Sequence, residues 1–240
     1  MGIDEHSWLR NKKGGYREFA TVVVDYNNKR VKELIPSRIV GQLNMALDYI
    51  PGRGRVKNVV LDLSKPYKSF AKGFFPNAQL IADKFHVVRL LNPAINKYRK
   101  DITGDKRKNP IRKLLLKSSV RLDYDTRKMI EKWLKEHPDL ESIYYAKEAL
   151  LKLYRCKGRK KAKRSLCLLL DALAISKIKE LQRLRRTLME WSNEILNYFE
   201  NRITNARTEG YNNVCKQLQK RAYGYRNFNH YRLKVLNVCC

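Results

Sequence analysis

Residues 56–83, VKNVVLDLSKPYKSFAKGFFPNAQLIAD, decide the fold class of this 240-residue chain. Val56–Leu63 and Ala78–Asp83 are apolar, β-branched runs of strand length. Between them, Pro66 begins a short helix, Tyr67–Phe75, because the first turn of a helix does not need the N–H group that proline lacks. Alternation of strand, helix and strand indicates an α/β layered domain.

The residues before this stretch extend the same pattern. Glu18–Asp25 is a β-branched run, Val31–Ile35 is a weaker strand, and Ile3 is predicted to lie at the end of a further short strand. Apolar residues recur at helical spacing over 39–50. The expected order is therefore β-β-β-α-β-α-β-α, which is typical of a mixed sheet covered by helices.

The residues after this stretch predict helices. No convincing strand occurs over 84–201, where leucines recur at helical periods among charged residues. Gly104 and Gly158, with charged neighbours, are the expected breaks between helices. Further helices are expected to begin near Glu209 and near Asn229.

Charge is the strongest compositional signal. The chain has 52 lysine and arginine residues against 23 aspartate and glutamate residues, which gives a net charge of +29. This excess favours a polyanionic partner, above all nucleic acid, and the alternative is a merely solvated basic surface. Hydrophobic residues make up 43% of the chain, enough to build a core and to exclude wholesale disorder.

The sequence does not predict a membrane protein. The longest apolar stretch, Leu166–Ile175, is short and contains Asp171, whereas a spanning helix needs about 20 apolar residues. The first ten residues, MGIDEHSWLR, lack the layout of a secretion signal. We therefore expect a cytoplasmic protein.

Three carboxylates follow apolar runs. Asp62 and Asp83 come at the ends of VVLDL and LIAD, and Asp4 follows Gly2-Ile3. Each taken singly is more often a helix cap or a turn residue. Carboxylates at adjacent strand ends repel one another unless a cation lies between them, and Mg²⁺ prefers such oxygen ligands. A basic protein with this cluster is expected to be a nuclease or polynucleotidyl transferase that uses two metal ions.

Two long blocks resemble a known family. VVLDLSKPYKSFAKGFFPNAQLIADKFHVVRLLNPA (Val59–Ala94) is similar to the core signature of bacterial insertion-sequence transposases of the DDE class, ISL3 group. NARTEGYNNVCKQLQKRAYGYRNFNHYRLKVL (Asn205–Leu236) resembles the C-terminal signature of the same group, and GIDE (Gly2–Glu5) resembles its opening. The resemblance implies an RNase H-like α/β fold: a mixed sheet flanked by helices, with a large all-helical insertion before the last catalytic helix.

The resemblance also implies a domain division and a catalytic triad. Residues 1–90 would form the first part of the RNase H-like catalytic core, residues 91–201 the helical insertion, and residues 202–240 the helices that complete the core. The implied triad is Asp4, Asp62 and Glu209, holding two Mg²⁺ or Mn²⁺ ions.

Asp83 and His86 form a D-x-x-H element. It resembles the element that follows the second Asp in related transposase groups, which makes both residues candidate catalytic residues. His86 would orient the scissile phosphate or a water molecule as a hydrogen-bond donor. The alternative is a histidine that packs beside Phe85 and caps the next helix.

The C-terminal block predicts a DNA-binding surface. After Glu209 the chain has no acidic residue, and basic residues interleave with aromatic ones. Such a mixture suits phosphate contact and base stacking, whereas the alternative for Tyr223 and Phe228 is packing onto the sheet. The candidate DNA-binding residues are Arg202, Arg207, Asn212, Asn213, Lys216, Lys220, Arg221, Tyr223, Arg226 and Asn227.

The expected activity is DNA transposition. The chain would bind transposon ends and target DNA, cleave by Mg²⁺-dependent hydrolysis and join the freed 3′-OH to target DNA, as a homodimer on DNA and without a membrane or small-molecule substrate. In the cell it would be associated with the bacterial nucleoid when bound to DNA.

Three alternatives remain open. Because only three residues precede Asp4 and the family normally carries an N-terminal zinc-ribbon and helix-turn-helix region, the chain is alternatively a truncated, inactive remnant that only binds DNA. The others are a stand-alone RNase H-like nuclease and a non-catalytic basic scaffold.

Overall fold

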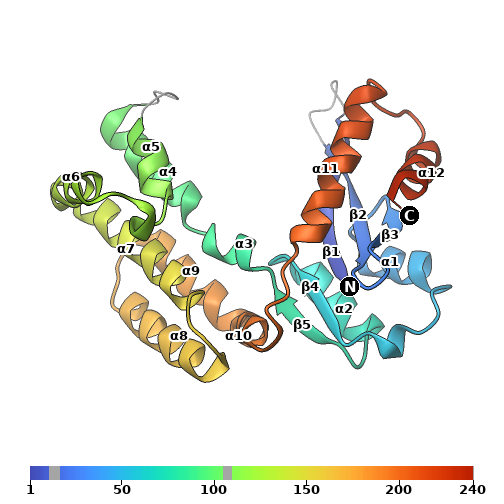
Figure 1. The fold of residues 1–240 in the computed structure, drawn as a ribbon, viewed down its shortest axis with the longest axis horizontal. Coiled ribbons are helices and arrows are strands. Elements are labelled where there is room, and N and C mark those ends of the chain that lie inside the picture. The colour runs from blue at the N-terminus through green and yellow to red at the C-terminus, as the bar shows by residue number, and fades with distance from the viewer. Residues whose placement is uncertain (11–16, 105–109, 240) are drawn as a thin grey trace. The chain divides into compact units, whose positions relative to one another are not determined.

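The computed structural model describes residues 1–10, 17–104 and 110–239. The chain divides into two compact units (Figure 1). The first unit consists of Met1–Asp83 and Asn201–Cys240, and the second of Lys84–Glu200. The first unit is thus built from both ends of the chain.

A five-stranded mixed sheet forms the centre of the first unit. Its strand order is β3-β2-β1-β4-β5. The pairs β1–β2 and β2–β3 are antiparallel, while β1–β4 and β4–β5 are parallel. This is an α/β fold of the RNase H-like kind, and it confirms the predicted order of elements. The strands are β1 (Gly2–Arg10), β2 (Arg17–Asp25), β3 (Arg30–Ile35), β4 (Asn58–Leu61) and β5 (Gln79–Ala82).

Strand β1 differs from its prediction. The sequence predicted a short strand ending near Ile3 and followed by Asp4, and that prediction is wrong. The strand begins at Gly2 and runs for nine residues, so Asp4 lies within it. The polar run after Ile3 does not look like a buried strand. It forms one because the antiparallel strand β2 pairs with it over most of its length and satisfies backbone groups along that edge.

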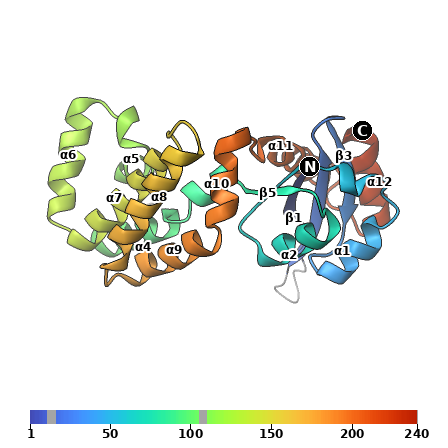
Figure 2. The same ribbon diagram turned by 90° about the horizontal axis from the view of Figure 1, so that it is seen from below.

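Helices cover both faces of the sheet (Figure 2). On one face lie α1 (Val40–Leu47) and α2 (Lys65–Phe74), where the hydroxyl groups of Thr21 and Tyr67 lie 2.8 Å apart. On the other face lie α11 (Ala206–Arg221) and α12 (Phe228–Cys239), and a 3₁₀ turn, Arg53–Arg55, precedes β4. The core beneath α11 and α12 consists of Ala20, Val22, Val24, Val31, Leu34, Cys215, Tyr231, Val235 and Cys239.

A buried histidine joins β1 to α12. His6 is 3% exposed, and its Nε2 lies 2.6 Å from the hydroxyl of Tyr231. Burial lowers the pKa of His6 from 6.5 to about 4, because an apolar environment disfavours the imidazolium. His6 therefore remains neutral in the folded protein at neutral pH.

This burial predicts loss of stability in acid. The unfolded histidine takes up a proton below pH 6.5 and the folded one only near pH 4, so the free energy of unfolding falls by about 2–3 kcal/mol as the pH drops through that window. Urea unfolding at pH 7.0 and pH 4.5 measures this loss. In the variant His6→Gln the fall between these pH values is expected to shrink by that amount. Equal falls in both proteins would contradict the prediction.

The second unit is helical. None of its described residues forms a strand, as predicted, and α7 packs against α3, α4, α6, α8 and α9. Gly104 and Gly158, with φ of 71° and 82°, lie at the end of α4 and the start of α8. No described helix in the chain has the length and apolar character to cross a bilayer. The helices are α3 (Lys84–Val88), α4 (Asn92–Thr103), α5 (Pro110–Leu116), α6 (Tyr124–Lys135), α7 (Pro138–Leu153), α8 (Arg159–Ala174), α9 (Lys179–Glu190) and α10 (Ser192–Asn201), with a 3₁₀ turn at Ser119–Arg121.

Candidate active site

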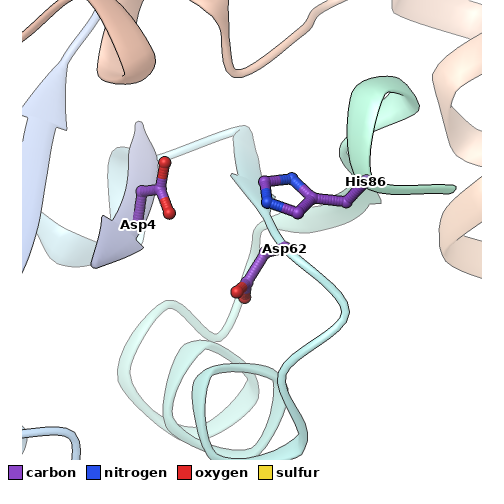
Figure 3. A group of neighbouring side chains, drawn as sticks. All are labelled: Asp4, Asp62 and His86. Atoms are coloured by element: carbon purple, nitrogen blue, oxygen red, sulfur yellow. The ribbon is translucent and has the colours of Figure 1, made fainter. Parts of the chain in front are cut away.

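Asp4, on β1, and Asp62, directly after β4, lie side by side (Figure 3). In the parallel β1–β4 pair, Gly2 is opposite Val60 and Ile3 is opposite Leu61. Asp62 follows β4 directly, so the same register brings it beside Asp4. Each offers a carboxylate oxygen within 4.8 Å of the other's, and Asp4 is only 7% exposed. The sequence placed Asp62 correctly at the carboxyl end of its strand.

Strand alternation sets the direction of Asp4. Side chains two residues apart in a strand point to the same face, so Asp4 shares its face with Gly2 and His6. A Cβ atom on Gly2 would lie 2.1 Å from Oγ1 of Thr208, which shows that α11 covers this face. Asp4 therefore points toward the layer that contains α11 and α12.

Glu209 belongs to the face of α11 that packs on β1. Asn205 Nδ2 donates to the carbonyl of Ile3 at 3.5 Å, and Asn212 Nδ2 donates to the carbonyl of Glu5 at 3.4 Å. Glu209 lies between these two residues on the same helical face, at the level of Asp4. It is half-buried. Within the described residues, however, Asp4, Asp62 and Glu209 do not have ligand atoms that all lie within 4.8 Å.

Asp83 contacts the start of α11. It follows β5 directly and is 1% exposed. Its Oδ1 accepts the backbone N–H of Asn205 at 2.9 Å. The Tyr26 hydroxyl donates to Asn205 Oδ1, also at 2.9 Å. Burial, reinforced by the charges of Asp83 and Asp4, raises the pKa of Tyr26 to about 12, so its hydroxyl stays protonated.

His86 lies in the second unit. It belongs to the short helix α3, three residues after Asp83, and it is half-buried (Figure 3). Its neighbour Phe85 is 43% exposed, with the Arg89 guanidinium 3.8 Å from the centre of the ring.

Nine of the ten predicted DNA-binding residues are exposed. The exception is Asn212, which is 4% exposed and packs on β1. Arg207 donates to the carbonyl of Tyr26 at 2.7 Å, and Asn227 accepts the N–H of His230 through Oδ1 at the start of α12. The exposed residues are Arg202, Arg207, Asn213, Lys216, Lys220, Arg221, Tyr223, Arg226 and Asn227.

Two residues that hold α11 in place, Asn205 and Tyr26, were not predicted from the sequence. Asn205 immediately precedes the helix, and asparagine at that position is a known helix-start signal. Tyr26 carries no such signal, because nothing in the sequence around it indicates that its hydroxyl reaches Asn205, 179 positions away.

Comparison with known proteins identifies the family of the chain. The model of the ISL3 family of DDE transposases, described as "Transposase", matches residues 1–235. The transposase for insertion sequence element IS1001 of Bordetella parapertussis is 25% identical over 232 residues, which cover 92% of this chain and 57% of that protein. The chain thus spans little more than half the length of this curated relative. No solved structure matches the chain. The match over nearly all of the sequence shows that the chain belongs to the ISL3 family of DDE transposases.

Proposed function

We propose that the chain performs Mg²⁺-dependent DNA strand cleavage and strand transfer during transposition. The observation that carries the proposal is the pair Asp4, on β1, and Asp62, directly after the parallel strand β4, whose oxygens lie within 4.8 Å of each other. Two carboxylates at this separation repel one another, and a divalent cation between them removes the repulsion. Their hard oxygen donors fit Mg²⁺ or Mn²⁺.

Each residue of the proposed site has a distinct role. Asp4 and Asp62 would hold the metal, with Glu209 on α11 as the third ligand. Two bound ions would supply activation of the attacking hydroxyl group and stabilisation of the leaving oxygen. Lysine and arginine side chains would position the DNA.

The proposed DNA-binding surface, here the α11 basic surface, follows the outer side of α11 and the turn after it. It consists of Asn213, Lys216, Lys220, Arg221 and Arg226, all exposed. No acidic residue follows Glu209 to neutralise it. Phosphate contacts by these cations would contribute most of the affinity for transposon ends and target DNA. In this proposal two protomers act together on the DNA.

Tyr223 stands out beside the α11 basic surface. Its side chain is fully exposed, and its backbone is left-handed, with φ of 52°. The turn is held by hydrogen bonds from the N–H of Tyr223 to the carbonyl of Lys220 and from the N–H of Gly224 to the carbonyl of Gln219. This position usually takes glycine, because a side chain there costs roughly 1–2 kcal/mol. An exposed aromatic ring beside cations, carried by a strained backbone, suits stacking on a DNA base.

This role predicts opposite effects on stability and binding. Replacing Tyr223 by Gly is expected to weaken the binding of single-stranded oligonucleotides by roughly fivefold to a hundredfold, because the stacking ring is lost. The free energy of unfolding is expected to hold or rise by up to about 1 kcal/mol, because glycine tolerates the left-handed backbone. Fluorescence anisotropy and urea unfolding measure the two effects. Tyr223→Phe, which keeps a ring, should bind like the wild type, and unchanged binding by Tyr223→Gly would refute the role.

A cleavage assay tests the proposed function. The purified chain is incubated with a plasmid carrying the DNA that flanks its coding sequence, in Mg²⁺ or Mn²⁺ and, as a control, in EDTA. Metal-dependent cleavage at the ends of the element is the expected result. Turnover of hybrid or branched substrates without preference for those ends would instead favour a stand-alone nuclease, and the absence of any metal-dependent cleavage would contradict the proposal.

A further inference from the structure

We infer that Asp83 is a positioning residue for Glu209 rather than a metal ligand. Its carboxylate accepts a hydrogen bond from the backbone at the start of α11, the helix that carries Glu209. The inference rests on the proposed function, because it assigns a purpose to the placement of Glu209. Asp62 and Asp83 follow two adjacent parallel strands, but in this inference only Asp62 binds the metal.

Asp83 makes hydrogen bonds through both its backbone and its carboxylate. Its own N–H donates to the carbonyl of Leu61 at 2.8 Å, which continues the β4–β5 pairing past the last strand residue. Its carboxylate is buried, and Oδ1 accepts the Asn205 N–H at 2.9 Å. A carboxylate at the first N–H groups of a helix is also favoured by the helix dipole. Asp83 therefore ties β5 to the first turn of α11.

Asn205 connects Asp83 to Glu209 through two hydrogen bonds that its backbone makes. Its N–H is held by Asp83, and its own carbonyl accepts the N–H of Glu209 at 2.9 Å. Its side chain bonds to the Tyr26 hydroxyl and to the carbonyl of Ile3. Asn205 itself is 0% exposed, so no water competes for these bonds. The chain of contacts runs without a break from Asp83 through one backbone unit to Glu209.

The first turn of α11 has a second restraint of the same kind. The Tyr26 hydroxyl also lies 3.0 Å from Oγ1 of Thr208, the residue before Glu209. Thr208 packs against Gly2, and a side chain at position 2 would collide with the Thr208 hydroxyl. Loosening this turn would shift Glu209 relative to Asp4 and Asp62. A displacement of about 1 Å in a catalytic group costs on the order of a hundredfold in rate.

Two substitutions at one position separate positioning from ligation. Asp83→Asn keeps an oxygen that accepts the Asn205 N–H, but it removes the negative charge that a metal ligand needs. Asp83→Ala removes both. We expect Asp83→Asn to retain Mn²⁺ affinity and DNA cleavage within about fivefold of wild type, and Asp83→Ala to lose about a hundredfold in cleavage. Calorimetric Mn²⁺ titration and a cleavage time course measure these effects.

Amide hydrogen exchange tests the restraint on α11 independently of catalytic activity. In Asp83→Ala the amides of Asn205 and Glu209 are expected to exchange faster than in wild type, and in Asp83→Asn at the wild-type rate. If Asp83→Ala does not fold, Tyr26→Phe removes a different anchor from Asn205 and should also speed exchange at these amides. Unchanged exchange in a folded Asp83→Ala, or in Tyr26→Phe where Asp83→Ala does not fold, would overturn the inference.

The outcomes also distinguish this inference from the proposed function. Suppose that Asp83→Asn remains folded but loses Mn²⁺ binding and cleavage as completely as Asp62→Asn. Asp83 would then be a metal ligand, and this result would overturn the inference but not the proposed function. A wild-type chain that shows no metal-dependent cleavage, but in which exchange at Asn205 and Glu209 responds to Asp83→Ala as expected, would overturn the proposed function and leave the restraint in place.

Discussion

Replacing Asp62 by Asn is expected to abolish metal-dependent DNA cleavage while leaving DNA affinity within about twofold of wild type. The amide removes the negative charge that a divalent cation needs and leaves the size of the side chain almost unchanged. Metal ions contribute several kcal/mol to the stabilisation of charge in phosphoryl transfer, so the rate should fall by at least about a thousandfold. DNA affinity should persist because the net charge of +29 resides in lysine and arginine residues elsewhere.

Mn²⁺ titration by calorimetry, a cleavage time course and anisotropy with labelled DNA measure the three properties. The matched control is Asp171→Asn, which makes the same charge change at an exposed position in α8 and should leave all three unchanged. Cleavage that survives Asp62→Asn would refute the assignment of Asp62. Absence of Mn²⁺ binding in both wild type and Asp62→Asn would instead favour a chain that binds DNA without catalysis.

Replacing Arg232 by Ala is expected to lower the free energy of unfolding by about 2–3 kcal/mol. Glu33 on β3 is 3% exposed, and its two carboxylate oxygens accept from Nε and Nη2 of Arg232 on α12 at 2.6 and 2.5 Å. The Tyr49 hydroxyl donates to the same carboxylate at 2.6 Å. Removal of Arg232 would leave a buried charge with only part of its partners, which costs more than the loss of an exposed ion pair.

The pH dependence identifies the group responsible. Burial on its own raises the pKa of Glu33, but hydrogen bonds from Arg232, Tyr49 and the Leu34 N–H outweigh it and hold the pKa below 4.5. The stabilisation is therefore complete above the unfolded value of about 4.5 and is lost as the pH falls through the lower folded value. Urea unfolding of wild type and Arg232→Ala should differ most at pH 7 and converge in acid. Lys234→Ala, an exposed change on the same helix, is the control, and a loss as small as its own would contradict this account.

Much of the first unit follows from its local sequence. Apolar runs bounded by polar residues predicted β2 to β5, because a strand buried on both faces needs continuous apolar side chains. The same runs placed Asp62 at the end of β4, and periodic leucines with glycine breaks predicted the helical second unit. The C-terminal signature predicted a helix at Glu209, and α11 begins three residues before it, at Ala206.

The tertiary structure decided what local pattern does not encode. The residues after Ile3 are too polar to be predicted as a strand, and they form one because β2 pairs with their backbone along one edge. On the other edge, side chains of α11 donate hydrogen bonds to the carbonyls of Glu5 and Trp8. Helical spacing alone grouped Asn212 with Lys216 and Lys220, but Asn212 is buried on β1 and the two lysines are exposed. Periodicity tells which residues share a face of a helix, whereas the layer that the helix packs on determines which face is buried.

The same distinction applies to the candidate active site. The sequence by itself singled out the candidate carboxylates, because their types and motifs are local properties. Only the tertiary structure decided that Asp4 lies inside a strand beside Asp62 and that Asp83 bonds to the backbone of Asn205, 122 positions away. Such a bond depends on strand register and on the docking of α11, and both result from packing between segments that are distant in the sequence.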